Sequence, residues 1–166
     1  MLNQKIRQDF RIIVVDPFQE TEELLRKEIK SSKVEFFLDP GEGKSYALNL
    51  IFQEYGSDNP EDLFILTDGD VYVSKNAINE IISKFKNPEI GCVTGKPVSL
   101  DSRNEKYGYW SHFLFEGIDR VRKFLSRQKK FFECSGYLFA IRKGILSEFP
   151  TEASEDSIIP HLFWKK

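Results

Sequence analysis

The sequence predicts an α/β fold in which helices pack against a largely parallel sheet. Three short apolar runs, at residues 11–16, 34–38 and 63–67, have the length and composition of buried strands. Each run is followed by a stretch with the composition or the periodicity of a helix. Strands and helices that alternate at this spacing are typical of a sandwich of helices around a parallel sheet.

The elements of the first hundred residues follow in order. Residues 21–30 carry acidic side chains early and basic side chains late, as the helix dipole favours. Residues 44–55 place their large apolar side chains on one helical stripe. A third helix is expected at residues 75–86 with Ser74 as its cap, and a further strand at residues 90–100.

The second half of the chain changes in character near residue 100. Residues 105–130 predict one long helix, interrupted or kinked near Gly108 or Gly117. Residues 131–143 predict a strand with a turn at Ser135-Gly136. The first half therefore has the pattern of a nucleotide-binding domain, and the second half is expected to have a different function.

Composition excludes several classes of protein. With 166 residues the chain is one domain or most of one, and its net charge of −2 gives it no general affinity for nucleic acid. No apolar stretch approaches the roughly 20 residues that span a bilayer, and the N-terminus lacks the apolar core of a signal peptide. Cys92 and Cys134 each stand alone, without metal-binding spacing. We therefore expect a cytoplasmic protein with two buried thiols.

Acidic side chains follow three of the predicted strands at the point where each strand ends. They are Asp16, Asp39 and the pair Asp68 and Asp70. In open parallel sheets, ligands collect at the carboxyl ends of the strands. Two carboxylates one residue apart repel each other unless a cation or hydrogen bonds compensate them. A short D-x-D is common in plain loops, but three strand ends aimed at one crevice favour a divalent metal site.

Other sites with similar motifs fit the sequence less well. Residues 41–45, GEGKS, look like the end of a phosphate-binding loop, but Leu38 occupies the position of its first glycine. A calcium loop that begins at Asp68 would require a glutamate at Asn79. A phosphatase motif D-x-D-x-T would require threonine at Tyr72. A nucleotide hydrolase therefore remains the weaker alternative to a divalent metal site at the strand ends.

Four stretches resemble, in order and spacing, the family 2 glycosyltransferases, the GT-A-fold enzymes that include chitin, cellulose and hyaluronan synthases. The stretches are IIVVD (12–16), GKSYALN (43–49), ILTDGDVYVSKNAI (65–78) with IGCVTGKP (90–97), and SGYLFAIRKGIL (135–146) leading to SEDS (154–157). The resemblance implies a GT-A-type sandwich of the nucleotide-diphospho-sugar transferases.

The resemblance also implies an activity and its partners. It implies an inverting hexosyl- or N-acetylhexosaminyl-transferase that moves a sugar from a nucleoside-diphosphate sugar, expected to be a UDP-sugar, to a hydroxyl of a glycan or lipid-linked acceptor. Such enzymes act in polysaccharide biosynthesis, and this reaction needs no nucleic acid. The implied cofactor is Mg²⁺ or Mn²⁺, because negative charge builds up on the departing diphosphate and a hard cation neutralises it.

On the donor side, the resemblance assigns roles to residues at the strand ends. Asp16 is expected at the base or ribose of the donor and Asp68 at the ribose. Asp70, with Asp68 beside it, is expected on the metal that bridges the diphosphate. Lys44 is placed near the phosphates.

On the acceptor side, the resemblance assigns Gly136 to the acceptor-binding wall and Asp156, in the pair Glu155-Asp156, to the catalytic base. A base is required because the acceptor hydroxyl loses a proton as it attacks. The single domain then has a nucleotide-binding half at residues 11–100 and an acceptor-binding half at residues 101–166.

The chain departs from the family pattern at both ends. Only ten residues precede Arg11, where the family has a further strand and helix, and the chain ends ten residues after Asp156. We expect a fragment, or a domain completed by another segment, that alone is weakly active or is a catalytically incomplete scaffold. Association with the cytoplasmic face of a membrane would then come from a C-terminal region outside this sequence. The basic run at residues 120–130 is interpreted as a solvated helix face, with an anionic membrane surface or a lipid phosphate as the alternative.

Overall fold

The computed structural model of the chain describes residues 4–130, 134–146, 148–151, 158–159 and 161. Its elements in chain order are β1 Ile12–Asp16, α1 Gln19–Glu28, β2 Val34–Leu38, α2 Lys44–Tyr55, β3 Leu63–Thr67, α3 Ala77–Lys84, β4 Cys92–Thr94, α4 Lys106–Arg127, β5 Leu138–Arg142 and the short 3-10 helix η1 Lys143–Ile145. The predicted alternation of strands and helices in the first half is confirmed.

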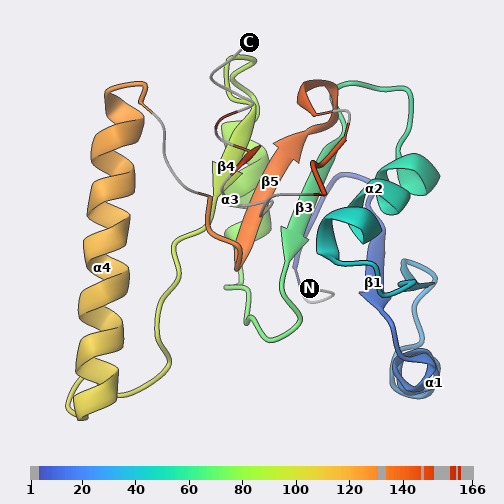
Figure 1. Cartoon of the computed structure of the whole chain (residues 1–166), viewed down its shortest axis with the longest axis horizontal. Coiled ribbons are helices and arrows are strands. Elements are labelled where there is room, and N and C mark those ends of the chain that lie inside the picture. Colours follow the sequence, from blue (N-terminus) through green and yellow to red (C-terminus); the bar gives the residue numbers. More distant parts are fainter. Residues whose placement is uncertain (1–3, 131–133, 147, 152–157, 160, 162–166) are drawn as a thin grey trace.

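The described strands form two sheets (Figure 1). Strands β1 and β2 form a parallel pair, in register from Ile12 opposite Val34 to Asp16 opposite Leu38. The second sheet has the order β3–β5–β4, and β5 is antiparallel to both of its neighbours. The expectation of a largely parallel sheet is therefore wrong for this second sheet. Strands β1 and β3 point the same way but belong to different sheets.

The sequence did not indicate that β5 is antiparallel, because the composition of this strand is that of a parallel one. All five of its residues, LFAIR, are buried, with Phe139, Ala140 and Ile141 fully inaccessible to solvent. A strand that is buried on both faces lacks the alternation typical of antiparallel strands and resembles a parallel one. The chain reaches β5 through the long helix α4, so no hairpin turn marks the reversal.

Side chains of β5 alternate between two apolar clusters, one on each face of the sheet. Phe139 and Ile141 join the cluster under α2, where the Phe52 ring stacks on Phe64 with centroids 3.9 Å apart. On the opposite face, Leu138 and Ala140 join a cluster with Ile81 and Phe85 from α3 and the residue after it. The sheet is thus a central layer with α2 and α3 on its two sides (Figure 1).

Several elements differ from the expectations in their bounds or their course. The strand expected at residues 131–143 is β5, Leu138–Arg142, which follows a turn at Gly136 and Tyr137. The cap of α3 is Asn76 and not Ser74, whose carbonyl instead accepts a hydrogen bond from the Ala77 amide. Strand β4 covers only Cys92–Thr94 of the expected 90–100. Helix α4 runs through both of its glycines without interruption, and Gly108 is needed for packing, since a Cβ there would lie 2.0 Å from the Ser102 carbonyl oxygen.

The two cysteines lie side by side, although the sequence separates them. The Sγ atoms of Cys92, in β4, and Cys134, shortly before β5, are 3.4 Å apart, and neither is in a disulfide. The hydrogen bond with Cys134 and burial raise the pKa of the Cys92 thiol well above its ordinary value. The prediction of buried thiols is therefore confirmed for Cys134, whereas Cys92 is only partly buried, and the two thiols form a pair.

Helix α4 stands beside the sheets, at the left of Figure 1. Asp119 anchors it: its carboxylate accepts a hydrogen bond from Lys123 on the same helix at 2.8 Å and pairs with Lys96 of the body at 3.6 Å. The hydrogen bond from Lys123 lowers the pKa of Asp119, partial burial opposes this decrease, and the charges of Lys123 and Lys96 lower the pKa further.

In the described part of the chain, no helix is both long and apolar enough to cross a bilayer.

Replacement of Asp119 by asparagine should destabilise the protein at pH 7 by about 0.5–1 kcal/mol. Because the folded protein lowers the pKa of this group, its contribution is full above about pH 4 and is lost as the pH falls through the folded pKa. Urea unfolding at pH 7 and at pH 3 should show the difference between D119N and wild type shrinking at the lower pH. Asp101→Asn, which changes an exposed aspartate just before the same helix, is the control. A difference in unfolding free energy between D119N and wild type that is equal at both pH values would contradict this prediction.

Candidate active site

An ion pair joins the start of α2 to the end of β3. The Lys44 Nζ lies 2.9 Å from the Asp68 Oδ1, and both side chains are partly open to solvent. The stacked rings of Phe52 and Phe64 hold helix α2 over β3. The start of α2 therefore has a fixed position relative to the end of β3. Part of the charge of the aspartate pair is thus compensated by a lysine from the glycine-rich loop.

The loop that leads into α2 is shaped by two glycines with left-handed backbones. Gly41 and Gly43 have φ values of 83° and 101°, a region that other residues rarely adopt. The Asp39 carboxylate accepts a hydrogen bond from the Gly41 amide at 2.9 Å and so braces the loop. Of the described atoms, none lies within 4 Å of a Cβ built on either glycine. The first turn of α2 is therefore approachable, and a helix N-terminus favours anions such as phosphate.

The two aspartates of the D-x-D are presented by one turn after β3. Asp68 is half-buried, whereas Gly69 and Asp70 are exposed. In the described part of the chain, no three His, Cys, Asp or Glu side chains are grouped closely enough to hold a metal alone. A Mg²⁺ ion commonly takes only one or two carboxylates and completes its shell with water and phosphate oxygens, so this donor set fits such a cation. The assignment of Asp68 and Asp70 to a metal stays a prediction.

Asp16 lies with Asp39 at the end of the other sheet. The Asp16 carboxylate accepts a hydrogen bond from the Phe18 amide at 2.8 Å, and its carbonyl accepts one from the Asp39 amide at 3.0 Å. These contacts fix the ends of β1 and β2 against each other. The expected contact of Asp16 with the donor base or ribose stays a prediction.

The turn that contains Gly136 lies at the same end of β3 as Asp68. The Thr67 hydroxyl donates a hydrogen bond to the Tyr137 carbonyl at 2.9 Å, which ties this turn to the last residue of β3. The structure thus brings together three of the expected site residues, Lys44, Asp68 and Gly136. Sequence reasoning missed the positioning role of Thr67, because the hydroxyl of a strand-ending threonine gives no sign of its partner.

Asn49 was the second residue that sequence reasoning missed. Its side-chain amide donates to the Phe149 carbonyl at 2.9 Å and accepts from the Phe149 amide at 2.7 Å, and both residues are buried. The sequence did offer one signal for this contact, which is that an amide side chain lies on the buried side of α2 and needs a hydrogen-bond partner there. Asn49 holds the chain a few residues before Glu155 and Asp156, which lie outside the described residues.

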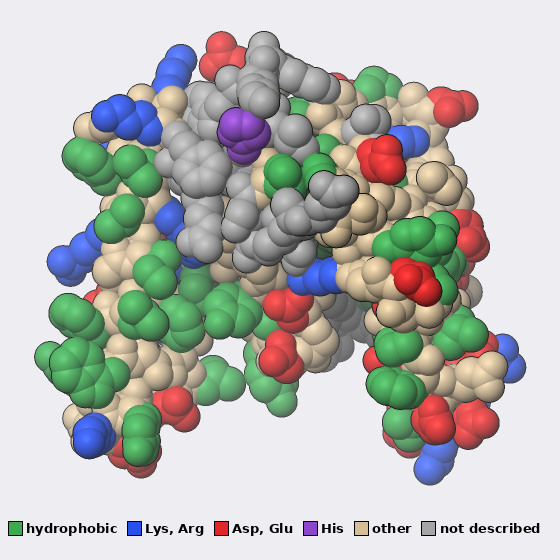
Figure 2. Space-filling view, in the orientation of Figure 1, with side chains coloured by type: hydrophobic (Ala, Val, Ile, Leu, Met, Phe, Trp, Pro, Cys, Tyr) green, Lys and Arg blue, Asp and Glu red, His purple; other side chains and the backbone are tan. Residues whose placement is uncertain are grey.

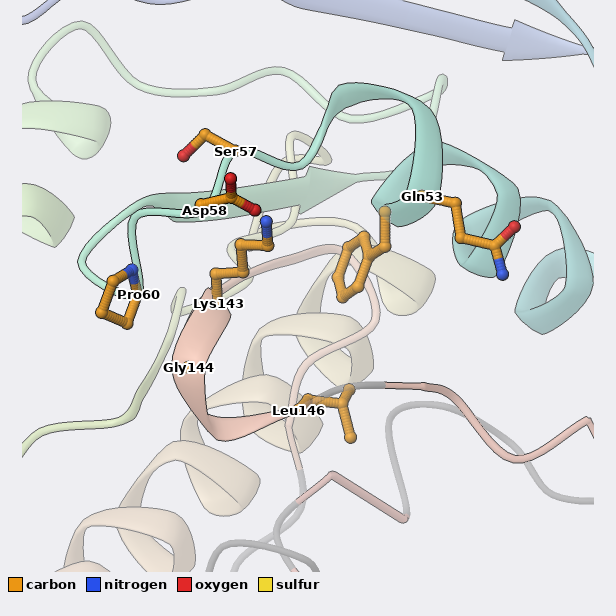
Figure 3. Close-up of a pocket in the computed structure, with 8 residues that line it drawn as sticks. Gln53, Ser57, Asp58, Pro60, Lys143, Gly144 and Leu146 are labelled. Carbon is orange, nitrogen blue, oxygen red and sulfur yellow. The ribbon is translucent and has the colours of Figure 1, made fainter.

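An open hollow of about 450 Å³ lies at the opposite end of β3 (Figure 3). Its lining includes Phe52 and Gln53 from the last turns of α2, and Pro60 and Lys143 from the chain around the start of β3 and the end of β5. The negative end of the α2 dipole faces this region, which disfavours a phosphate there. The donor is therefore expected at the Asp68 end of β3 and not in this hollow.

Comparison with known proteins identifies the family of this chain. The sequence model described as glycosyl transferase family 2 matches residues 1–149. The chain belongs to this family. No curated protein and no solved structure gives a significant match to it. Family 2 membership establishes a glycosyltransferase domain of the GT-A fold and implies a nucleotide-sugar donor and an acceptor.

In this family 2 domain, Asn49→Ala should lower the free energy of unfolding by about 2–4 kcal/mol, because both backbone groups of Phe149 would be left buried without a partner. Urea unfolding followed by fluorescence measures the change. Gln53→Ala, an exposed amide on the same helix, is the matched control and should stay within about 0.5 kcal/mol of wild type. Equal stability of the two variants would show that the two hydrogen bonds between Asn49 and Phe149, which we call the Asn49 clamp, have no energetic role.

Proposed function

We propose that this domain is an inverting, metal-dependent transferase that moves a hexosyl or N-acetylhexosaminyl group from a UDP-sugar to an acceptor hydroxyl. The observation that carries the proposal is the contact of Lys44 with Asp68, which joins the glycine-rich loop to the D-x-D. Phosphates at the first turn of α2 would lie beside both Lys44 and the carboxylates that suit a hard cation.

Each donor residue has a task in this proposal. Asp16 contacts the base or ribose, and Asp68 the ribose. Lys44 contacts the phosphates and supplies one positive charge. Asp70, with Asp68, would hold Mg²⁺ or Mn²⁺, which when bound neutralises the negative charge of the leaving nucleoside diphosphate.

The acceptor reacts in one displacement. Gly136 lines the space for the acceptor, and Asp156 removes the proton from its hydroxyl as the hydroxyl attacks the anomeric carbon, with Glu155 next to it in the sequence. The bond to the diphosphate breaks on the opposite side of that carbon. A single attack of this kind inverts the anomeric configuration.

The setting of the reaction follows from the resemblance to chitin, cellulose and hyaluronan synthases. We propose a glycan or lipid-linked acceptor, a role in polysaccharide biosynthesis, and a location in the cytoplasm or at the cytoplasmic face of a membrane. We further propose that a strand from another segment completes the fold between β1 and β3. The support is that these two strands point the same way yet lie in separate sheets.

Donor binding tests the assigned site. Titration of UDP in the presence of Mn²⁺ by calorimetry should give binding to wild type, weakened by about ten- to a hundredfold in D70N and in Lys44→Met, because each loses one charged contact to the metal or phosphates. Asp58→Asn, an exposed aspartate before the start of β3, should bind like wild type. If neither this chain nor one extended by an N-terminal strand binds UDP, the proposed site is wrong.

The base is tested separately from donor binding. Asp156→Asn should retain the calorimetric affinity for UDP and Mn²⁺ but slow sugar transfer by about 10²–10⁴-fold, since only the proton transfer is lost. Release of UDP with a panel of acceptors measures the rate, and Glu155→Gln is the comparison at the neighbouring position. A transfer rate that D156N leaves unchanged would remove Asp156 from the mechanism.

A further inference from the structure

Helix α4 turns an apolar face away from the body of the protein. An ordinary surface helix points its apolar stripe inward and its charged residues outward. On α4, seven large hydrophobic side chains are each more than half exposed: Tyr107, Tyr109, Trp110, Phe113, Leu114, Val121 and Phe124. Figure 2 shows hydrophobic side chains along the whole helix at the left of the molecule, with Lys and Arg among them.

The exposed side chains form a continuous stripe. Trp110, Leu114, Gly117, Val121 and Phe124 follow one another at alternating steps of four and three residues, the spacing that keeps side chains on one side of a helix. Among the described atoms, none lies within 4 Å of a Cβ built on Gly117, so the stripe is open at its middle as well. We call these five residues, with Phe113 beside them, the outer stripe.

The side of α4 that faces the rest of the protein makes several polar contacts. Asp119 pairs with Lys96 at 3.6 Å, and an Arg122 guanidinium nitrogen lies 3.5 Å from the Cys134 carbonyl oxygen. The His112 ring lies 3.0 Å from the Asp101 carbonyl oxygen. Phe115 also packs edge-on against Tyr137, with ring centroids 6.1 Å apart, but most of the aromatic side chains of this helix are left exposed. A contiguous apolar surface of this kind marks an interaction site.

The charge of this segment indicates the nature of the partner. Residues 106–130 contain seven Lys and Arg and two acidic residues, a net charge of +5, whereas the whole chain has −2, which leaves −7 for the remainder. Arg120 and Arg127 are exposed seven residues apart along one border of the outer stripe, with Lys123, which is paired with Asp119, between them. A positive helix on an otherwise negative protein is attracted to an anionic surface and repelled by a second copy of itself.

We propose that α4 is a membrane-surface helix that lies flat on an anionic bilayer. The outer stripe enters the boundary between headgroups and acyl chains, where aromatic side chains are favoured, and Arg120 and Arg127 contact lipid phosphates. This site is separate from the proposed donor site and does not depend on it. The basic run at residues 120–130, interpreted from sequence as a solvated face, is thus assigned to the membrane.

Sedimentation with lipid vesicles tests this assignment on the full chain. The protein should bind vesicles of phosphatidylcholine and phosphatidylglycerol in equal parts, and bind vesicles of phosphatidylcholine alone much more weakly. Added salt should release it from the anionic vesicles, because surface attraction between charges is screened.

Two pairs of matched double variants separate the contributions of stripe and charge. Trp110→Ser with Phe113→Ser should lower partition by about tenfold or more, while Phe18→Ser with Leu24→Ser, equally exposed at the other end of the molecule, should not. Arg120→Glu with Arg127→Glu should abolish the preference for anionic vesicles. Arg26→Glu with Lys27→Glu in α1 changes the net charge equally and should preserve it.

Three results would overturn the proposal. Wild type could fail to bind the anionic vesicles, or the stripe variant could bind them as well as wild type does. Light scattering could instead show a dimer that the stripe variant dissociates, without lipid binding, which would assign the stripe to a second copy. Circular dichroism of each variant confirms that it is folded before it is compared.

Discussion

The insertion of β5 between β3 and β4 is the constraint on which the rest of the structure depends. This strand bonds to a neighbour on each side and supplies apolar side chains to both faces of the sheet. Its last residue, the buried Arg142, pairs with Glu61 and donates a hydrogen bond to the Phe85 carbonyl at 2.8 Å. Helices α2 and α3 therefore keep their places only while β5 is in the sheet.

The candidate site inherits its geometry from this arrangement. Because β5 fixes β3, the turn before β5 meets Thr67, and the end of β3 meets the first residue of α2. The tips of β1 and β2 belong to the other sheet and are joined through Asp16 and Asp39. In the proposed donor site, the residues assigned to the phosphates therefore lie on the central layer. The residue assigned to the nucleoside, Asp16, lies on the smaller, parallel pair of strands.

Elements with local signals could be predicted from the sequence, and those fixed by distant contacts could not. Residues 34–38, 44–55 and 63–67 fold as predicted, because strand composition and helical periodicity are contained within each segment. The direction of β5, the clamp of Asn49 on Phe149 and the partner of Thr67 depend on residues far away in the chain. The acidic residues at strand ends could be found as candidates, but the lysine that compensates Asp68 needed coordinates to be matched with it.

The thiol pair between β4 and the chain entering β5 has a consequence for how the protein meets oxidants. In the folded state the raised pKa of Cys92 keeps the sulfur protonated, and a thiol is a far poorer nucleophile than a thiolate. When β4 leaves β5, Cys92 regains ordinary acidity and reaches solvent, and it meets Cys134, 42 residues later in the sequence, again when the strands pair. A disulfide at this position would therefore accumulate at the pace of local opening, and its formation rate would report how often the central sheet comes apart.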